Sequence, residues 1–184
     1  LYKNKILLYS LIFLLGLLSS YGLPPYNFFY VNFFSYPVLL WILLLYSKDK
    51  VISFNIGWIF GFGYFISNLY WITNSLTFED IFKPLIPFAL ILVPLFLWLF
   101  YGLSTLFFSL TNPKKNILSI FLFTTFLSIF EYIRGLILGG FPWNLIAFSF
   151  VNYLEFIQLL SITGTYAFNS LIILLFTLPT ICLL

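Results

Sequence analysis

An acid and a base lie within one helical turn of each other in a chain that otherwise carries little charge. Glu131 and Arg134 belong to the stretch FEYIRGLILGGFPWN, and only 7% of the 184 residues are Asp, Glu, Lys or Arg. Residues three positions apart on a helix share a face, so this carboxylate and guanidinium are placed to pair. The pair would either stabilise helix packing or hold the head group of a lipid or peptide. Both alternatives stay open on the sequence alone.

The predicted depth of this pair in a membrane makes burial of its charges unfavourable in free energy. We predict a membrane helix over residues 117–138, which places Glu131 roughly 10 Å below the outer helix end at about 1.5 Å per residue. A charge near the bilayer centre costs on the order of 3 kcal/mol on insertion scales. Ionisable residues at that depth are therefore candidates for function, and we take Glu131 and Arg134 as candidate substrate-binding residues.

Further candidates are expected near the same membrane surface. Trp and Tyr are typical of membrane–water interfaces, where they anchor helices. Simple anchoring is therefore the alternative to ligand binding for these residues. The additional candidate substrate-binding residues are Phe141, Pro142, Trp143, Tyr70, Trp71 and Asn74.

The composition excludes several kinds of chemistry. The chain has no His and a single Cys, which excludes a His-based catalytic triad, a His zinc site and an intrachain disulfide. Cys182 is predicted at the cytoplasmic end of the last span, a membrane thickness away from Glu131, so no base would activate its thiol. We therefore assign no catalytic residue and expect no metal and no cofactor. The net charge of +3 comes from a few lysines and does not indicate a nucleic-acid partner.

The elements that carry these residues are predicted to be membrane helices. The chain is 62% hydrophobic with a mean hydropathy of +1.10, and its apolar runs reach roughly 20 residues, the length needed to cross a bilayer. We predict an all-α fold, a polytopic membrane helix bundle of about six transmembrane helices in a single domain over residues 1–184. The predicted spans are 6–22, 28–46, 51–72, 84–110, 117–138 and 163–184, with an interfacial helix over 152–160.

Individual spans carry more specific expectations. The first is expected to be an uncleaved helix, with a cleaved signal peptide as the alternative. Gly57 and Gly61 form a small-xxx-small pattern in the third span that predicts close helix packing. The fourth span is longer than a bilayer is thick, so it must tilt or kink. Because the sequence lacks Met and stops inside an apolar run, we expect it to be a fragment of a longer protein.

The distribution of lysines predicts the orientation. With six spans, one side of the membrane receives most of the cations, which predicts a cytoplasmic amino terminus. The opposite face then carries LPPYN, SLTFEDIF and GGFPWN. The lysines assigned to the cytoplasmic side are Lys3, Lys5, Lys48, Lys50, Lys114 and Lys115.

Four stretches in order resemble a known family. Their most specific part is the spacing of Glu131, Arg134 and the FPW tripeptide, which a second motif, ITGTY, follows. The chain resembles the membrane portion of apolipoprotein N-acyltransferase over nearly its whole length. The stretches are LPPYNFF, GFGYFISNLYWI, FEYIRGLILGGFPWN and LEFIQLLSITGTYAFNSLIILL.

The resemblance implies an enzyme of the bacterial inner membrane. Such an enzyme takes an acyl chain from a phospholipid onto a cysteine thioester and passes it to the amino group of a diacylated apolipoprotein. The resemblance further implies that its catalytic Glu, Lys and Cys lie in a nitrilase-like domain, to which no residue of this chain corresponds. The implied partners are a phospholipid acyl donor, a diacylated apolipoprotein and membrane lipids, with Glu131, Arg134 and Trp143 near the rim of a lipid cavity.

Two other classes of function stay open. A small transporter or channel would use the intramembrane pair along its pathway. A non-catalytic membrane assembly factor would use the glycines and prolines for packing only.

Overall fold

The chain is almost entirely helical. The computed structural model describes residues 4–137 and 139–184, without the side chains of residues 70–72 and 75. No strand occurs within these ranges. The α-helices are α1 (Lys5–Ser20), α2 (Asn32–Tyr46), α3 (Lys50–Ile66), α4 (Ile86–Leu110), α5 (Ile117–Ile137), α6 (Leu154–Ile157), α7 (Leu160–Thr163) and α8 (Thr165–Thr177). The 3-10 helices are η1 (Phe29–Val31), η2 (Tyr70–Thr77), η3 (Asp80–Leu85), η4 (Ile146–Phe150) and η5 (Leu178–Leu183).

Two of the long helices begin at polar caps that the sequence supplies. The Asn4 side chain accepts a hydrogen bond from the Leu7 backbone N–H at 3.3 Å at the start of α1. The Asp49 carboxylate accepts one from the Ile52 N–H at 3.0 Å at the start of α3. Each cap satisfies a backbone donor that the first helical turn leaves unpaired, which fixes where the helix begins.

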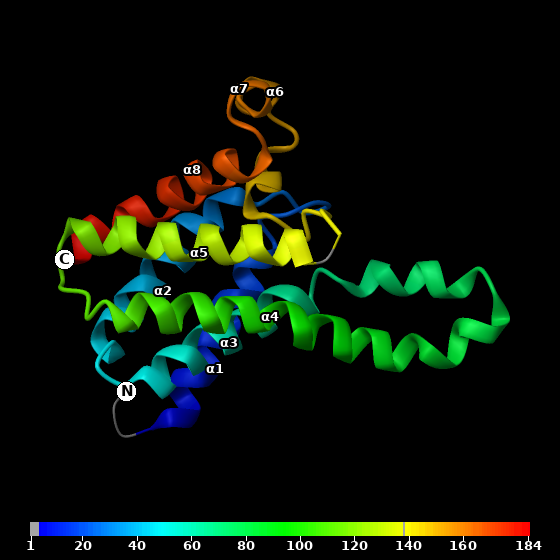
Figure 1. Cartoon of the computed structure of the whole chain (residues 1–184), viewed down its shortest axis with the longest axis horizontal. Coiled ribbons are helices and arrows are strands. Elements are labelled where there is room, and N and C mark those ends of the chain that lie inside the picture. Colours follow the sequence, from blue (N-terminus) through cyan, green and yellow to red (C-terminus); the bar gives the residue numbers. More distant parts are fainter. Residues whose placement is uncertain (1–3, 138) are drawn as a thin grey trace.

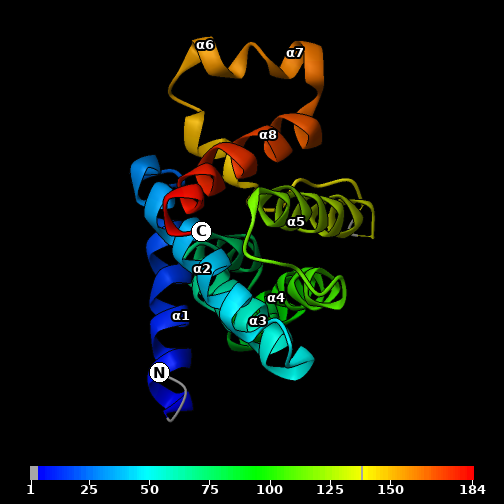
Figure 2. The same ribbon diagram turned by 90° about the vertical axis from the view of Figure 1, so that its left-hand side faces the viewer.

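Six long helices form a closed ring. Following the packing contacts, α1 packs on α3, α3 on α4, α4 on α5, α5 on α8, α8 on α2, and α2 returns to α1. Figure 2 shows α4 and α5 nearly end-on, with α1 and α5 on opposite sides and α2 and α3 between them. Neighbours in the ring are therefore not always neighbours in the sequence.

Small residues on α3 allow the close packing that the sequence pattern predicts, and the structure identifies α4 as the partner helix. A side chain at Gly57 would meet the Tyr101 carbonyl and Thr105, and one at Gly61 would meet Trp98 and Tyr101. The Thr105 hydroxyl also donates to the Ser53 carbonyl at 2.8 Å, so the close approach carries a hydrogen bond between the two helices. Gly57 and Gly61 are helix-packing residues.

The fold is a membrane helix bundle. Within the described ranges, four helical stretches are long and apolar enough to cross a bilayer, and large apolar side chains are exposed on their outer faces. The helices α1 and α3, with 16 and 17 residues, are apolar but shorter. The count of six membrane crossings therefore stays a prediction. The four long stretches are Phe29–Tyr46, Asp80–Leu110, Ile117–Ile137 and Thr165–Cys182.

The helix bounds differ from the predicted spans mainly after α3. That helix ends at Ile66, and the stretch YWITN begins the separate 3-10 helix η2. The Ser67 hydroxyl bonds to Ser20 at 2.6 Å, and the Asn68 amide donates to the Ser20 carbonyl at 3.1 Å. These bonds attach the end of α3 to the end of α1, and the chain changes direction there.

Two segments project from the ring. Figure 1 shows η2, η3 and the amino-terminal half of α4 extending together well beyond the other helices. The same view shows α6 and α7 standing away from the bundle above the start of α8. The helix α4 alone has 25 residues, which is about 37 Å at 1.5 Å per residue and exceeds the roughly 30 Å hydrocarbon core.

Candidate functional site

The intramembrane pair lies in the protein interior. Glu131 is 1% exposed and Arg134 is 0% exposed. The Arg134 Nη2 atom lies 3.9 Å from the Glu131 Oε1 atom, one turn away on α5. The two side chains form the ion pair that their spacing indicates, enclosed by protein.

The Glu131 carboxylate is held by two further helices. The Tyr101 hydroxyl of α4 donates to Oε1 at 2.9 Å. The Asn169 amide of α8 donates to Oε2. The carboxylate thus accepts hydrogen bonds from two separate helices and pairs with Arg134, which offsets the cost of removing its charge from water.

The Arg134 guanidinium is directed toward the loop after α5. Its Nη2 atom donates to the Trp143 carbonyl at 2.6 Å, and its central carbon lies 5.0 Å from the centre of the Phe65 ring. Its Nε and Nη1 atoms have no hydrogen-bond partner among the described residues. Contact between Arg134 and a lipid head group stays a prediction, and in this conformation the side chain is enclosed.

A set of buried polar side chains fixes the loop that follows. Arg134 holds the Trp143 carbonyl, and the Tyr64 hydroxyl of α3 donates to the next carbonyl, that of Asn144, at 2.8 Å. Further along, the Ala147 backbone N–H donates to the Asn169 side-chain oxygen at 3.0 Å. Residues Tyr64, Tyr101, Glu131, Arg134 and Asn169, called the anchor network below, therefore join α3, α4, α5 and α8 to the loop 141–151.

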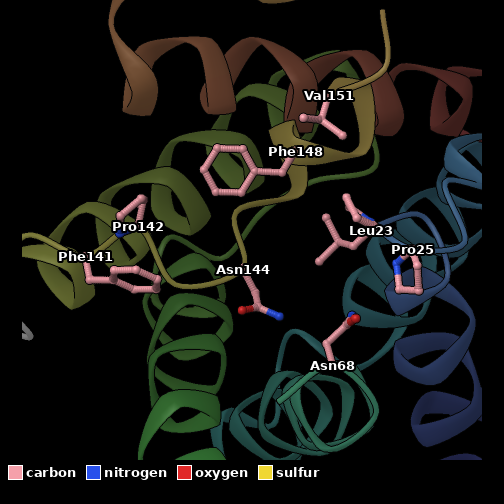
Figure 3. Close-up of a pocket in the computed structure, with 9 residues that line it drawn as sticks. Leu23, Pro25, Asn68, Phe141, Pro142, Asn144, Phe148 and Val151 are labelled. Atoms are coloured by element: carbon pink, nitrogen blue, oxygen red, sulfur yellow. The ribbon is translucent and has the colours of Figure 1, made fainter. Parts of the chain in front are cut away.

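The anchored loop lines a cavity of about 490 Å³. This volume lies within the range of roughly 300–1,000 Å³ typical of small-molecule sites. Figure 3 shows the labelled residues converging on the space between the loop after α5, the end of α3 and the loop after α1. The lining residues are Leu23, Pro24, Pro25, Asn68, Phe141, Pro142, Asn144, Phe148 and Val151.

The predicted site residues fall into different places. Phe141 and Pro142 line the cavity. Trp143 packs its ring edge-on against Phe141 with 4.9 Å between ring centroids, and so supports the lining. Asn74 is exposed in η2 and does not line the cavity. The predictions for Tyr70 and Trp71 lie outside the described side chains.

Sequence reasoning missed most of the anchor network. Tyr64, Tyr101 and Asn169 each lie on a different helix from Glu131, and each is buried. The signal that could have found them is a polar side chain inside an otherwise apolar span. Asn169 belongs to the unusually polar start of the last span. The sequence does not show which helices are in contact, so this signal identifies buried polar residues but not the partners to which they bond.

The comparisons with known proteins agree on one family. The sequence model of the apolipoprotein N-acyltransferase N-terminal domain matches residues 15–178. Curated relatives named apolipoprotein N-acyltransferase are 32% identical over 175 residues in Allorhizobium ampelinum, 31% over 180 residues in Brucella melitensis and 32% over 175 residues in Rhodopseudomonas palustris. These alignments cover 90%, 92% and 91% of this chain and 33%, 33% and 32% of the relatives. The chain spans about a third of the length of the curated relatives it matches.

Proposed function

The chain belongs to the apolipoprotein N-acyltransferase N-terminal domain family, and from this we propose that it forms the lipid-binding membrane part of an acyltransferase. The proposed reaction moves an acyl chain from a phospholipid to the amino group of a diacylated apolipoprotein in the bacterial inner membrane. The family match over residues 15–178 and the names of the relatives support this proposal.

The observation that carries the proposal is the cavity. Its lining is predominantly apolar and includes the FP dipeptide of the motif that carries the family resemblance. An apolar cavity at the end of a membrane bundle suits a fatty acyl chain, because the chain leaves the bilayer without exposing its methylene groups to water. In this proposal Phe141 and Pro142 contact the acyl chain, and Trp143 supports Phe141.

The anchor network has a positioning role in the proposal. Glu131 and Arg134 are bonded to protein groups and are enclosed, so they act on a ligand through the loop 141–151. A transporter would instead place the pair along a pathway. Their bonds to Tyr101, Asn169 and the Trp143 carbonyl favour the positioning role.

The 184 residues by themselves are not proposed to transfer an acyl group. Splitting a phospholipid ester requires a nucleophile with an adjacent base and donors for the oxyanion. Within the described residues, the lining of the cavity includes no Cys, Lys or carboxylate. Binding and positioning of the lipid are the functions assigned to this part.

Photolabelling tests the proposed acyl site. The chain is purified in dodecyl maltoside with a trace of phosphatidylethanolamine that carries a diazirine in one acyl chain, and labelled peptides are identified by mass spectrometry. We expect labelling of the segment 139–151. Val151→Phe, at an exposed position of the cavity lining, is expected to reduce this labelling at least about threefold, because the added ring occupies space that the acyl chain needs.

The matched control is Leu154→Phe, which introduces the same ring at a position that is 70% exposed and does not line the cavity. This variant is expected to label like the unmodified chain. Labelling spread evenly over the outer faces of the helices, with no effect of Val151→Phe, would overturn the proposed acyl site.

A further inference from the structure

Among the described residues that line the cavity, two asparagines are the polar members. The other lining residues are Leu, Pro, Phe or Val. Figure 3 shows the Asn68 and Asn144 carboxamides entering the same space from the end of α3 and from the loop after α5. A pair of amides facing each other across an apolar cavity supplies hydrogen-bond donors and acceptors to a ligand group that lies between them.

Both asparagines are held in place by contacts that leave hydrogen-bonding capacity for a ligand. Asn68 is buried and uses one amide N–H on the Ser20 carbonyl at 3.1 Å. Asn144 is fixed through its backbone carbonyl, which accepts from Tyr64 at 2.8 Å. Within the described part of the chain its carboxamide makes no hydrogen bond.

The backbone of Asn144 favours a small set of residues. Its φ angle is +42°, in the left-handed region that Gly, Asn and Asp adopt most readily. Asn meets this requirement and also presents an amide to the cavity. Gly would meet the backbone requirement alone, which makes Asn144→Gly a way to remove the side chain without straining the loop.

The chemistry of the lining defines the ligand group. None of the lining residues that the structure describes is charged, so none of them supplies a cation to pair with a phosphate. Neutral amides suit a neutral carbonyl or ester oxygen. We propose that Asn68 and Asn144 hydrogen-bond the ester that joins an acyl chain to glycerol, with the acyl chain in the apolar part of the cavity and any charged head group outside it.

This inference rests on the proposed acyl site and adds a recognition element to it. Glycerol esters occur both in phospholipids and in the diacylglyceryl group of a lipopeptide, so the amide pair would fit either source. An ether-linked lipid has the same shape and lacks the ester carbonyl. Discrimination between ester and ether is therefore the property that this pair would produce and that apolar lining alone would not.

The experiment compares ester and ether probes on the full chain. Diazirine phosphatidylethanolamine in ester and ether forms, and a diazirine dipalmitoylglyceryl-cysteine peptide in the same two forms, are added separately to the chain in dodecyl maltoside. Labelling of the segment 139–151 is expected to favour ester over ether by about fivefold for at least one of the two sources, consistent with one or two net hydrogen bonds. The source with the larger ratio identifies the ligand.

The variants assign the preference to the asparagines. Asn144→Gly and Asn68→Ala are each expected to bring the ester-to-ether ratio close to one, because the ester probes lose their hydrogen-bond partner. Asn112→Gly is the matched control, since Asn112 also has a positive φ, of +50°, and lies in the turn between α4 and α5. Thermal unfolding of each variant is measured alongside, since Asn68→Ala also removes the hydrogen bond to the Ser20 carbonyl.

The outcomes separate the two proposals. Equal ester and ether labelling of 139–151 in the unmodified chain would overturn the role of the asparagines and leave the acyl site intact. An ester preference that persists in both variants would overturn it too. Failure of all probes to label 139–151 would instead contradict the acyl site itself.

Discussion

At the residue scale, the buried ion pair of Glu131 and Arg134 connects α5 to α4, to α8 and to the loop 141–151. The Glu131 carboxylate accepts hydrogen bonds from side chains of α4 and α8, and the Arg134 guanidinium donates one to the Trp143 carbonyl. Removing one partner would leave the other charge buried and unpaired, which typically costs about 3–5 kcal/mol, whereas replacing both by apolar groups is often tolerated. A comparison of single and double variants therefore distinguishes a contribution of the pair to the stability of the bundle from a role in positioning the loop 141–151.

Replacing the two charged residues singly and together distinguishes these two roles. Glu131→Leu and Arg134→Met are each expected to lower the free energy of unfolding by about 3 kcal/mol, and the double variant is expected to recover at least about half of that loss. Thermal unfolding in detergent, followed by size-exclusion chromatography of a fluorescent fusion, is the measurement.

The double variant has a second expected property. Because it lacks the bond to the Trp143 carbonyl, the loop 141–151 loses one of its anchors, and lipid labelling of that loop should fall although the protein is folded. A double variant that is both stable and labelled normally would show that the pair contributes to packing alone.

At the element scale, contact between α3 and α4 depends on glycines that let the helices approach. A methyl group at Gly57 would meet the Tyr101 carbonyl oxygen and the Thr105 side chain, so the two helices would have to move apart to admit it. The same α4 segment presents the Tyr101 hydroxyl to Glu131, so the spacing of these two helices also sets the geometry of the anchor network.

Gly57→Ala is therefore expected to destabilise the bundle by about 1–3 kcal/mol, the range for overpacking a close contact. Thermal unfolding is compared with that of Val51→Ile, which also adds one methyl group to α3, at a position that is 70% exposed. Equal unfolding temperatures for the two variants would contradict the close packing at Gly57.

At the scale of the whole molecule, the orientation in the membrane controls which compartment the cavity faces. We propose that the amino terminus is cytoplasmic, because the lysines concentrate at the start of α1, between α2 and the first residue of α3, and in the loop after α4. The cavity is lined by loops that the same threading places on the opposite face. A lipid bound there would have its head group on the outer side of the inner membrane.

Reporter fusions test this orientation. Alkaline phosphatase fused after Asn27, Phe78 or Asn144 is expected to be active, since the enzyme requires the periplasm, and fusions after Lys50 or Lys115 are expected to be inactive. A green fluorescent protein fusion at each site provides the inverse readout. An active phosphatase after Lys50 would contradict six crossings with a cytoplasmic amino terminus.

The sequence by itself determined the class of fold, the capacity of the third long helix for close packing at Gly57 and Gly61, and the membership of a family. Each of these depends on local composition or spacing: apolar length predicts a membrane helix, and Gly57 and Gly61 predict close approach. The spacing of Glu131 and Arg134 likewise predicted that they pair, since one helical turn fixes their distance.

The tertiary structure decided which residues surround the pair and where the cavity lies. In a soluble helix the apolar face identifies the side that packs, whereas here both the lipid-facing and the protein-facing sides are apolar, so periodicity does not choose a neighbour. Tyr101 and Asn169 are 30 and 38 residues from Glu131 in the chain and reach it only because α4, α5 and α8 are adjacent in the ring. The cavity likewise combines the loop after α1, the end of α3 and the loop after α5, segments that close on one another only when the ring is complete.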